Sequence, residues 1–577
     1  MRNRITPAVA ATLIMVLALV LGTFSTARGV PRIPRSDVIE LRTFGTNPVF
    51  DPASAPGAGV TDRGSCTTSG DPTKDIDISC DDLIAPDNEL AIVANPENPN
   101  HLVAGSNDYQ LHFLGQTAVV RIPVGSFVSK DGGETWYDSQ VPLGNSSLGT
   151  GDPAPIFNAR YDTVHMASLG FVCGQGSPIC TRGNIQVANS TDGGYTWQKP
   201  ITVAKGVGAD LAAQQLFNDK EWLTADNNPE SPFYGRLYMV WVTFRIEKGF
   251  YDESPVMFSY SDDAGQSWSN PKEISGSNED FCTFQDDQND VDRGQEGQFE
   301  CDQDQFAYPA VGPNGELYVH FHNEQNEQAW EAGEMYESQI MVVKSTDGGE
   351  TWSEPVHVVQ MEDSYTSPGD YPLNVSGRTT LTGHQFRVNS AGNIAADSNG
   401  NVYIVFADNA DGVTDSENPV TNTNIFLAYS TDGGSTWWGG DDGANTDLGS
   451  RIRVDGSPDS DQWFPWADVG PDGTLHVLYM DGHTDRVLYD ISITSGSIPF
   501  GFFSKEVVSQ EPSDPNHSLF FQAGPMAEGC ETCATFIGDY NGLAVGSDGR
   551  VHGVWTDMRR IFEPAGLTVE DAFYARR

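Results

Sequence analysis

The sequence predicts an all-β fold, a seven-bladed β-propeller with four-stranded antiparallel blades, and three observations support this prediction. One short motif that ends in tryptophan occurs five times. A second pattern, two strand-like runs around a glycine-containing turn, recurs along the same chain. The 577 residues include 60 glycines and 34 prolines, and few stretches show helical periodicity. One recurring supersecondary unit at such spacing is typical of a ring of small sheets.

The first motif is Ser-x-Asp-x-Gly-x-(Thr/Ser)-Trp, and each copy predicts a hairpin turn between two strands. Its aspartate offers acceptors to backbone N–H groups, and its glycine permits a positive φ. Five equivalent turns cannot all line one active site, so the repetition favours a folding role over catalysis or metal binding. The copies span residues 129–136, 190–197, 261–268, 345–352 and 430–437.

The second pattern predicts the two inner strands of each unit. Seven units can be counted, and two hairpins per unit give the four strands of one propeller blade. Six blades with an irregular extra hairpin are the alternative. The last unit lacks one strand, and we expect Val38–Phe44 to supply it and so remove the open edge of the ring. The units lie at 90–106, 153–168, 222–241, 307–321, 394–406, 466–479 and 542–555.

The N-terminal stretch predicts export. Residues 1–27 combine Arg2 and Arg4, an apolar run and small residues before Arg28, as in a secretory signal peptide. An uncleaved membrane anchor is the alternative, because residues 5–24 carry no charge. Residues 28–84 are interpreted as an extension that contributes the closing strand, and residues 85–577 as the propeller. The expected location is therefore secreted or cell-surface.

The eight cysteines agree with an extracellular location. They fall into pairs that are close in sequence, as disulfides that staple loops would require. A redox or metal site is the alternative for the last pair, although no second cysteine pair or histidine cluster stands at zinc-like spacing. The predicted disulfides join Cys66 to Cys80, Cys173 to Cys180, Cys282 to Cys301 and Cys530 to Cys533.

The formal net charge of −48 limits the partners. Nucleic acid and anionic membrane surfaces are excluded as expected partners, because a field of this sign repels both. No cofactor is required by the sequence. A calcium ion is considered for one acidic run, since calcium prefers clustered oxygen ligands. That run contains Glu279, Asp280, Asp286, Asp287, Asp290, Asp292, Glu300, Asp302 and Asp304.

Polar and aromatic residues precede the inner strands of several units. In a propeller these strand ends converge on the axial mouth, where carboxylates from different blades can provide an acid and a base. The alternative is that these residues only cap strands and pack blades. The catalytic candidates are Asp219, Glu221, Asp304, Arg387, Asp461, Asp539 and Tyr540. The candidates for sugar binding are Lys220, Trp222, His384, Asn389 and Trp463.

The tryptophan-ended copies resemble the Asp-box (BNR) repeats of the sialidase superfamily, over the chain from about residue 85 onward. The resemblance implies a β-propeller, but such repeats also occur in other glycoside hydrolases, polysaccharide-active enzymes and non-catalytic propellers. Sialidases use three arginines, a tyrosine with a glutamate partner, and an aspartic acid. Arg121–Pro123 matches their first arginine motif but lies on an expected third strand, and spacing assigns none of the others.

The resemblance implies a secreted carbohydrate-active hydrolase of sialidase type that acts on terminal sugars of glycans or polysaccharides. The alternative is a non-catalytic propeller that binds glycan or protein at the cell surface. A polysaccharide lyase with His384 or Tyr540 as base is a further possibility. The identity of the sugar stays open, and a closed acidic ring is expected to be a monomer.

Overall fold

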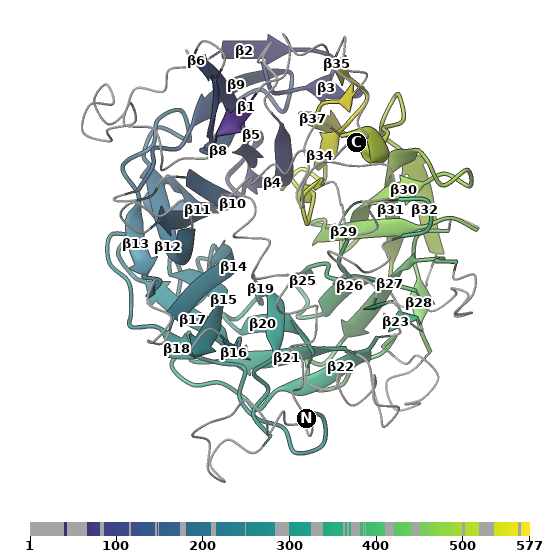
Figure 1. Cartoon of the computed structure of the whole chain (residues 1–577). Helices are drawn as coiled ribbons and strands as arrows, with labels where there is room; N and C mark the ends of the chain where they lie inside the picture. Colours follow the sequence, from purple (N-terminus) through teal and green to yellow (C-terminus); the bar gives the residue numbers. More distant parts are fainter. Residues whose placement is uncertain are drawn as a thin grey trace, which may run out of the picture.

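Seven antiparallel sheets stand around a common axis in the computed structural model, so the fold is a seven-bladed β-propeller (Figure 1). This confirms the predicted fold class and decides against six blades. The structure describes residues 40–42, 66–80, 86–114, 117–144, 147, 149–173, 180–208, 215–247, 250–282, 299–324, 338–361, 364–365, 369–370, 381–384, 386, 388–409, 420–440, 450–456, 459–498, 502–518, 536–562 and 567–577.

Each blade begins at the axis and adds strands outward, and the first and third blades have five strands rather than the expected four. From the innermost strand outward, the first blade contains β4 (Asp87–Asn95), β5 (Asn98–Asp108), β8 (Val124–Ser129), β9 (Thr135–Gln140) and β2 (Cys66–Ser69); the second contains β10 (Gly149–Asn158), β11 (Thr163–Cys173), β12 (Cys180–Ser190) and β13 (Ile201–Ala204); and the third contains β14 (Gln215–Ala225), β15 (Leu237–Glu247), β17 (Val256–Ser261) and β18 (Lys272–Glu273), with β16 (Phe250–Glu253) also paired with β15. The fourth blade contains β19 (Asp304–Val311), β20 (Leu317–Asn323), β21 (Gln339–Ser345) and β22 (Val356–Gln360), and the fifth contains β25 (Ile394–Ala396), β26 (Val402–Asp408), β27 (Asn424–Ser430) and β28 (Ile452–Arg453). The sixth blade contains β29 (Gln462–Val469), β30 (Leu475–Gly482), β31 (Tyr489–Ser497) and β32 (Phe502–Val507), and the seventh contains β33 (Gly542–Val545), β34 (Val551–Asp557), β37 (Asp571–Arg576) and β3 (Ile76–Asp77).

Smaller elements decorate the ring. A three-stranded sheet contains β1 (Glu40–Arg42), β7 (Thr117–Arg121) and β6 (Gln110–Leu114), and its β6–β7 hairpin is inserted between the second and third strands of the first blade. Arg121 therefore ends an inserted hairpin rather than lying on a third blade strand. The other elements are β23 (Ser364–Tyr365), β24 (Gly369–Asp370), β35 (Ile561–Phe562), β36 (Leu567–Thr568) and the 3₁₀ turns η1 (Ala159–Tyr161) and η3 (Pro515–His517).

A strand from the N-terminal part of the chain completes the last blade. Ile76 and Asp77 of β3 pair with Tyr574 and Phe573 of β37. The prediction that Val38–Phe44 fills this position is wrong, because Glu40–Arg42 of that stretch pairs in parallel with β7 instead. The physical advantage is as expected, since the added strand covers an edge that would otherwise expose unpaired backbone groups.

The five Asp-box turns join the third and fourth blade strands, far from the innermost strands in chain order. In the fourth blade, the Asp347 carboxylate accepts hydrogen bonds from the Thr351 N–H (2.9 Å), the Thr351 hydroxyl (2.6 Å) and the Ser345 hydroxyl (2.8 Å). Burial opposes the carboxylate charge, but these donors outweigh it and lower the pKa of Asp347 to about 2. The same bonds recur around Asp131, Asp192, Asp263 and Asp432. The box aspartates therefore have a structural role within their turns.

The second box glycine is required by its surroundings as well as by its backbone. Gly133 has a φ of +92°, and a Cβ atom there would lie 2.1 Å from the Tyr574 hydroxyl. Gly349 has the same φ, and its Cβ would lie 2.3 Å from the Phe258 ring. Any side chain at these positions would both strain the turn and collide with a core ring.

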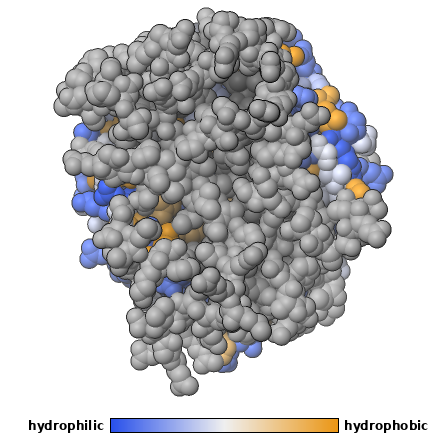
Figure 2. All heavy atoms as spheres, in the orientation of Figure 1, coloured by the Kyte–Doolittle hydropathy of each residue, from blue (hydrophilic) through white to orange (hydrophobic). Residues whose placement is uncertain are grey.

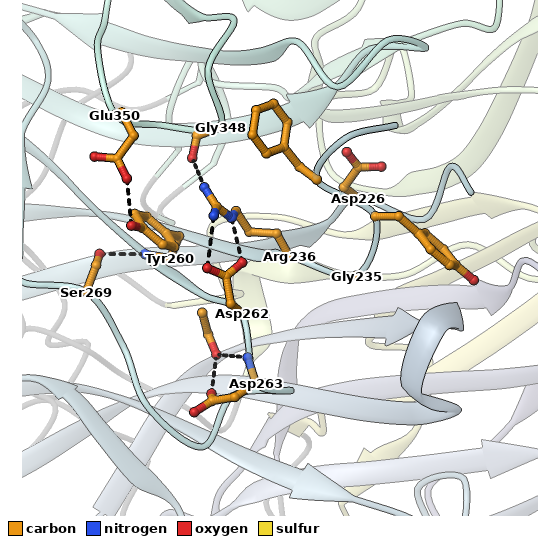
Figure 3. A network of polar contacts seen from close by, with 12 residues as sticks. Asp226, Gly235, Arg236, Tyr260, Asp262, Asp263, Ser269, Gly348 and Glu350 are labelled. Carbon is orange, nitrogen blue, oxygen red and sulfur yellow. Dashed lines mark hydrogen bonds and ion pairs between the residues drawn. The ribbon is translucent and has the colours of Figure 1, made fainter. Parts of the chain in front are cut away.

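Box turns also dock their blade on the preceding one. Figure 3 shows Arg236 of the third blade paired with Asp262 through two hydrogen bonds while donating to the Gly348 carbonyl of the next blade's box at 2.9 Å. Tyr260 likewise donates to Glu350 at 2.7 Å. The equivalent carbonyls of three other boxes accept from a preceding blade: Gly132 from Arg576, Gly193 from His101 and Gly433 from Lys344.

We expect the Asp347→Ala variant to lose about 1–2 kcal/mol of unfolding free energy, because the turn loses its shared acceptor and leaves donors unsatisfied. Urea unfolding followed by tryptophan fluorescence measures this. The control is Asp472→Ala, since Asp472 in the β29–β30 turn accepts from the Thr474 N–H on an exposed surface. Equal losses in the two variants would contradict the role of the box.

The core lies between neighbouring blades, where large rings such as Trp136, Trp241 and Trp555 are fully buried. Figure 2 shows hydrophilic residues prevailing over hydrophobic ones along the visible described rim. Disulfides join Cys66 to Cys80 and Cys282 to Cys301, as predicted. Cys173 and Cys180 are opposite each other in the β11–β12 register, whereas Cys530 and Cys533 lie outside the described residues.

No helix in the described part of the chain has the length and apolar character needed to span a membrane. The leader at residues 1–27 lies outside the described residues.

Candidate functional site at the propeller hub

The inner strands of five blades share a bulge near their starts. At each bulge the register with the second strand shifts, between Asn88 and Ala91 in the first blade and equivalently in the others. A residue that is not glycine adopts a left-handed backbone there, with φ between 50° and 57°. Such strain is stored where a bulge redirects a side chain. The five residues are Glu89, Asp152, Lys220, Phe306 and Phe464.

Three of these bulge residues meet at the hub. The Lys220 ammonium lies 3.2 Å from a Glu89 carboxylate oxygen, 3.2 Å from Asp152 and 2.5 Å from Asp539, which immediately precedes the last blade. These groups come from the first, second, third and seventh blades. They are brought together because equivalent positions in a ring of blades converge on one axis (Figure 1).

The charges of this cluster are strongly coupled. Burial opposes the Lys220 charge, but the carboxylates of Asp152, Asp539 and Glu89 outweigh it and raise the pKa of Lys220 well above its usual range. Burial, followed by repulsion from Asp152, raises the pKa of Glu89 well above its usual range. The surroundings therefore favour the charged form of Lys220 and the protonated form of Glu89.

Asparagine side chains hold the cluster in place. Asn107 donates to Glu89 at 2.8 Å and accepts from the Asp152 backbone N–H at 2.8 Å, so one amide fixes two bulges. Asn389, a predicted binding residue, donates to the Asp539 carbonyl at 3.0 Å. This hydrogen bond is to the backbone of Asp539 and not to its carboxylate, so Asn389 supports the position of Asp539.

Glu221 follows Lys220 and is 1% exposed. Neither of its carboxylate oxygens has a hydrogen-bond partner from another described residue. Burial first, and then repulsion from Asp152, raise the pKa of Glu221 well above its usual range. Asp219, on the other side of Lys220, accepts a hydrogen bond from the Lys220 backbone N–H at 3.0 Å. Glu221 is thus a buried carboxyl group beside the ionic cluster, in surroundings that favour its protonated form.

Aromatic rings pack beside these carboxyl groups. Trp222 lies at ring-centroid distances of 5.1 Å from Tyr308, 4.6 Å from Trp466 and 5.3 Å from Tyr540. Trp222, Tyr308 and Trp466 all stand two residues after a bulge, so the repeat places them together. Tyr540, a predicted catalytic residue, is buried, and burial raises its pKa well above the usual range. The Lys220 ammonium lies 5.8 Å from the Tyr540 ring centre.

Asp304 belongs to a different network, within its own blade. It accepts a hydrogen bond from the Asn323 amide at 2.7 Å, and Gln339 donates to Asn323 at 2.9 Å. Burial raises the pKa of Asp304 well above its usual range. These contacts connect the first, second and third strands of the fourth blade, so Asp304 has a structural role in that blade.

Three further predicted residues form a second group between the fifth and sixth blades. Asp461 accepts from Arg486 at 2.7 Å and from the Thr423 N–H at 2.9 Å. His384 packs beside Trp463 with ring centres 5.5 Å apart, and burial lowers the pKa of His384 to about 4. The described contacts of this group are with each other and with blade loops rather than with Lys220.

Arg387 lies outside the described residues. Part of the acidic run is described, and one carboxylate oxygen from each of Glu253, Glu300 and Asp302 lies within 4.8 Å of the others. Arg245 already pairs with Glu253 in this group. Asp286, Asp287, Asp290 and Asp292 are outside the described residues, and calcium binding stays a prediction.

Sequence reasoning missed Glu89 and Asp152. Both stand at the starts of the two weakest repeat units, directly before the strand-like runs that were recognised there. The rule that identified Lys220 and Asp539, a polar residue at the start of an inner strand, applies to them as well. The left-handed bulge was not foreseeable, because no glycine marks it.

No protein-family model matches the chain, and no curated protein matches it. A protein of unknown function from Dyadobacter fermentans is 12% identical with a TM-score of 0.40, covering 89% of this chain and 99% of that one. A Hadza microbial sialidase is 12% identical with a TM-score of 0.39, covering 89% and 94%. An ulvan lyase of a polysaccharide lyase family is 10% identical with a TM-score of 0.42, covering 85% and 94%. At these values the likenesses assign neither a family nor a site.

Proposed function

We propose that this protein is a carbohydrate-active hydrolase whose acid and base groups lie at the propeller hub. The observation that carries the proposal is the pairing of two unlike carboxyl groups. Glu221 is buried with a raised pKa, while Asp152 keeps about a tenth of its side chain exposed and contacts the Lys220 ammonium. Two carboxyl groups whose environments differ in this way are the pattern that glycosidic bond cleavage uses.

The roles follow from the chemistry of each group. Glu221, whose raised pKa favours the protonated form, acts as the acid that donates a proton to the oxygen that leaves with the departing sugar. Asp152, kept next to a cation, provides the carboxylate that attacks the sugar or activates a water molecule. Lys220 fixes the position of that carboxylate, and Trp222, which is partly exposed, offers a ring on which a sugar can stack. The resemblance of the five turns to Asp-box repeats supports the same class of activity.

We expect Glu221→Gln to lower kcat/KM on fluorogenic glycosides by about 100-fold or more, because the amide cannot supply the proton. Its urea midpoint should change little, since the amide has nearly the same shape and volume as the carboxyl group. Glu350→Gln on the outer face is the matched control and should keep full activity. Full activity in Glu221→Gln would overturn the assignment of the acid.

The non-catalytic alternative has its own signature. If the purified protein hydrolyses no glycoside in a broad panel, but glycans still bind and Trp222→Ala abolishes that binding, the hub is a recognition site without catalysis.

A further inference from the structure

One segment near the N-terminus contacts both blades at the seam where the ring closes. Residues 66–80, which we name the clasp, place β2 on the outer edge of the first blade and β3 on the outer edge of the seventh (Figure 1). The disulfide between Cys66 and Cys80 joins the two ends of the clasp. A covalently closed loop therefore bridges the two blades on the outer side of the ring.

The clasp is attached to each blade by a short edge strand. β2 has four residues and pairs with β9 of the first blade, and beyond it the Gly70 N–H donates to the Glu134 carbonyl at 3.1 Å. β3 has two residues and pairs with β37 of the seventh blade, where the Arg576 N–H donates to the Pro72 carbonyl at 2.7 Å. Strands this short can separate from a sheet by local opening, because few hydrogen bonds hold each of them.

The disulfide limits this opening. Cys66 is the first residue of β2, and the Cys80 N–H donates to the Asp138 carboxylate of β9 at 3.2 Å, so the chain returns from the seventh blade to the first. The Thr68 hydroxyl donates to the Asp77 carbonyl at 2.9 Å and connects β2 with β3. While the disulfide is intact, the ends of the clasp stay together, and a strand that detaches gains little conformational freedom.

The clasp disulfide is accessible, in contrast to the second disulfide that the described residues form. Cys66 and Cys80 are both partly exposed. Cys282 and Cys301 are 0% exposed and lie in the hydrophobic core. Thiol–disulfide exchange requires a thiolate to reach a disulfide sulfur. A reductant can therefore act on the clasp while the core disulfide stays intact.

We propose that the Cys66–Cys80 disulfide is a redox-sensitive lock on the closed ring, and that a dithiol reductant opens it. One thiolate of the dithiol attacks a sulfur of the pair and forms a mixed disulfide, and the second thiol group of the dithiol then displaces the protein thiol. Two electrons and two protons pass to the pair, which ends as two cysteine thiols, while the dithiol becomes a cyclic disulfide. The clasp regains conformational freedom, and β3 detaches from β37 more often.

The seam that the clasp bridges also supports the hub. Glu89 belongs to the first blade and Asp539 directly precedes the seventh, and both contact Lys220. The Asn88 amide donates to the Glu570 carboxylate at 2.8 Å across the same seam. Opening of the clasp therefore acts on two of the blades that meet at Lys220, whether or not the hub is catalytic.

Mass spectrometry of the native full-length chain tests the lock. The protein is incubated with dithiothreitol without denaturant, freed thiols are alkylated, and hydrogen exchange is measured on a parallel sample. We expect alkylation of Cys66 and Cys80 but not of Cys282 and Cys301. The β37 peptide should exchange faster than in the oxidised protein by about tenfold or more, whereas the β21 peptide of the fourth blade should not change. A clasp disulfide that stays oxidised, or unchanged exchange in β37 after its reduction, would overturn the proposal.

A double variant assigns the effect to this one disulfide. Cys66→Ser combined with Cys80→Ser should show the fast exchange of β37 without dithiothreitol, and the reductant should add no further increase there. Thr67→Ser changes an exposed residue of β2 but keeps the disulfide, so this control should exchange like the native protein. If the double variant does not fold, reduction of the native protein decides. Slow exchange of β37 in a folded double variant would contradict the lock.

Discussion

Replacing Lys220 with methionine is expected to lower the free energy of unfolding by about 3–5 kcal/mol, because three carboxyl groups would stay buried around an apolar side chain. The ammonium connects the third blade to the first, second and seventh. Methionine keeps the length and most of the volume of the lysine stem, so packing is retained and the loss reports on charge. Urea unfolding at pH 7 measures the effect.

Two further variants make this experiment specific. Lys272→Met removes an ammonium that pairs with Glu350 at 3.1 Å on the surface, and we expect its urea midpoint to change little, since exposed pairs contribute little. Adding Asp539→Asn to Lys220→Met should recover part of the lost stability, because a carboxylate that has lost the ammonium is then replaced by a neutral amide. Equal effects of the two lysine variants would show that the hub cluster is not held by charge.

The repeated turns could be predicted from sequence because their information is local. The aspartate, the glycine and the threonine of each box lie within a few residues of one another, and the bonds between Asp347 and Thr351 need no distant partner. Counting the turns and the paired runs gave the number of blades. The docking of Gly348 on Arg236, 112 residues away in sequence, has no such local signal.

The strand that closes the ring could not be predicted from the local sequence pattern. β3 consists of Ile76 and Asp77 alone, which is too short for any alternation to be visible, whereas Val38–Phe44 has a clear strand-like pattern. The selection is made by tertiary contacts: the Arg576 N–H donates to the Pro72 carbonyl at 2.7 Å, and Arg577 donates to the Thr73 carbonyl at 3.0 Å. Strand propensity could not reveal those contacts.

The hub was predicted in part for a similar reason. Lys220, Glu221, Trp222, Asp539 and Tyr540 were found by their position in the repeat, and the structure brings them together. Asp304 and Asp461 satisfy the same rule, yet their carboxylates turn to Asn323 and Arg486. Position in a repeat tells which end of a blade a residue occupies, but the direction of its side chain depends on the bulge.

The seam that closes the ring contains opposed acidic groups. Asp571 of β37 lies directly opposite Asp557 of β34, and Asp77 of β3 lies on the next strand. Arg560 pairs with Asp571, and Arg559 pairs with Asp557 and Asp75. Burial first, and then repulsion from Asp77, raise the pKa of Asp571 to about 8, and burial raises that of Asp77 to about 6. Glu570, beside them, has a pKa raised by burial to about 8.

These raised pKa values determine the direction in which pH changes the stability of the fold. Between the unfolded pKa near 4 and the folded values of about 6 to 8, the native state binds more protons than the unfolded chain. The contribution of these groups to stability is therefore complete below about pH 4 and is lost as the pH rises to about 8. Above that, ionised carboxylates on adjacent strands repel one another across the seam.

We expect Asp571→Asn to remove a large part of this dependence. Relative to the native protein, the variant should gain about 2–4 kcal/mol of unfolding free energy between pH 5 and pH 9, because it has no proton to lose. Urea unfolding at both pH values measures the change, with Asp472→Asn as a control whose difference from the native protein should not vary in this range. A difference between Asp571→Asn and the native protein that is flat with pH would show that the Asp571 carboxyl group is already ionised in the closed ring at pH 5.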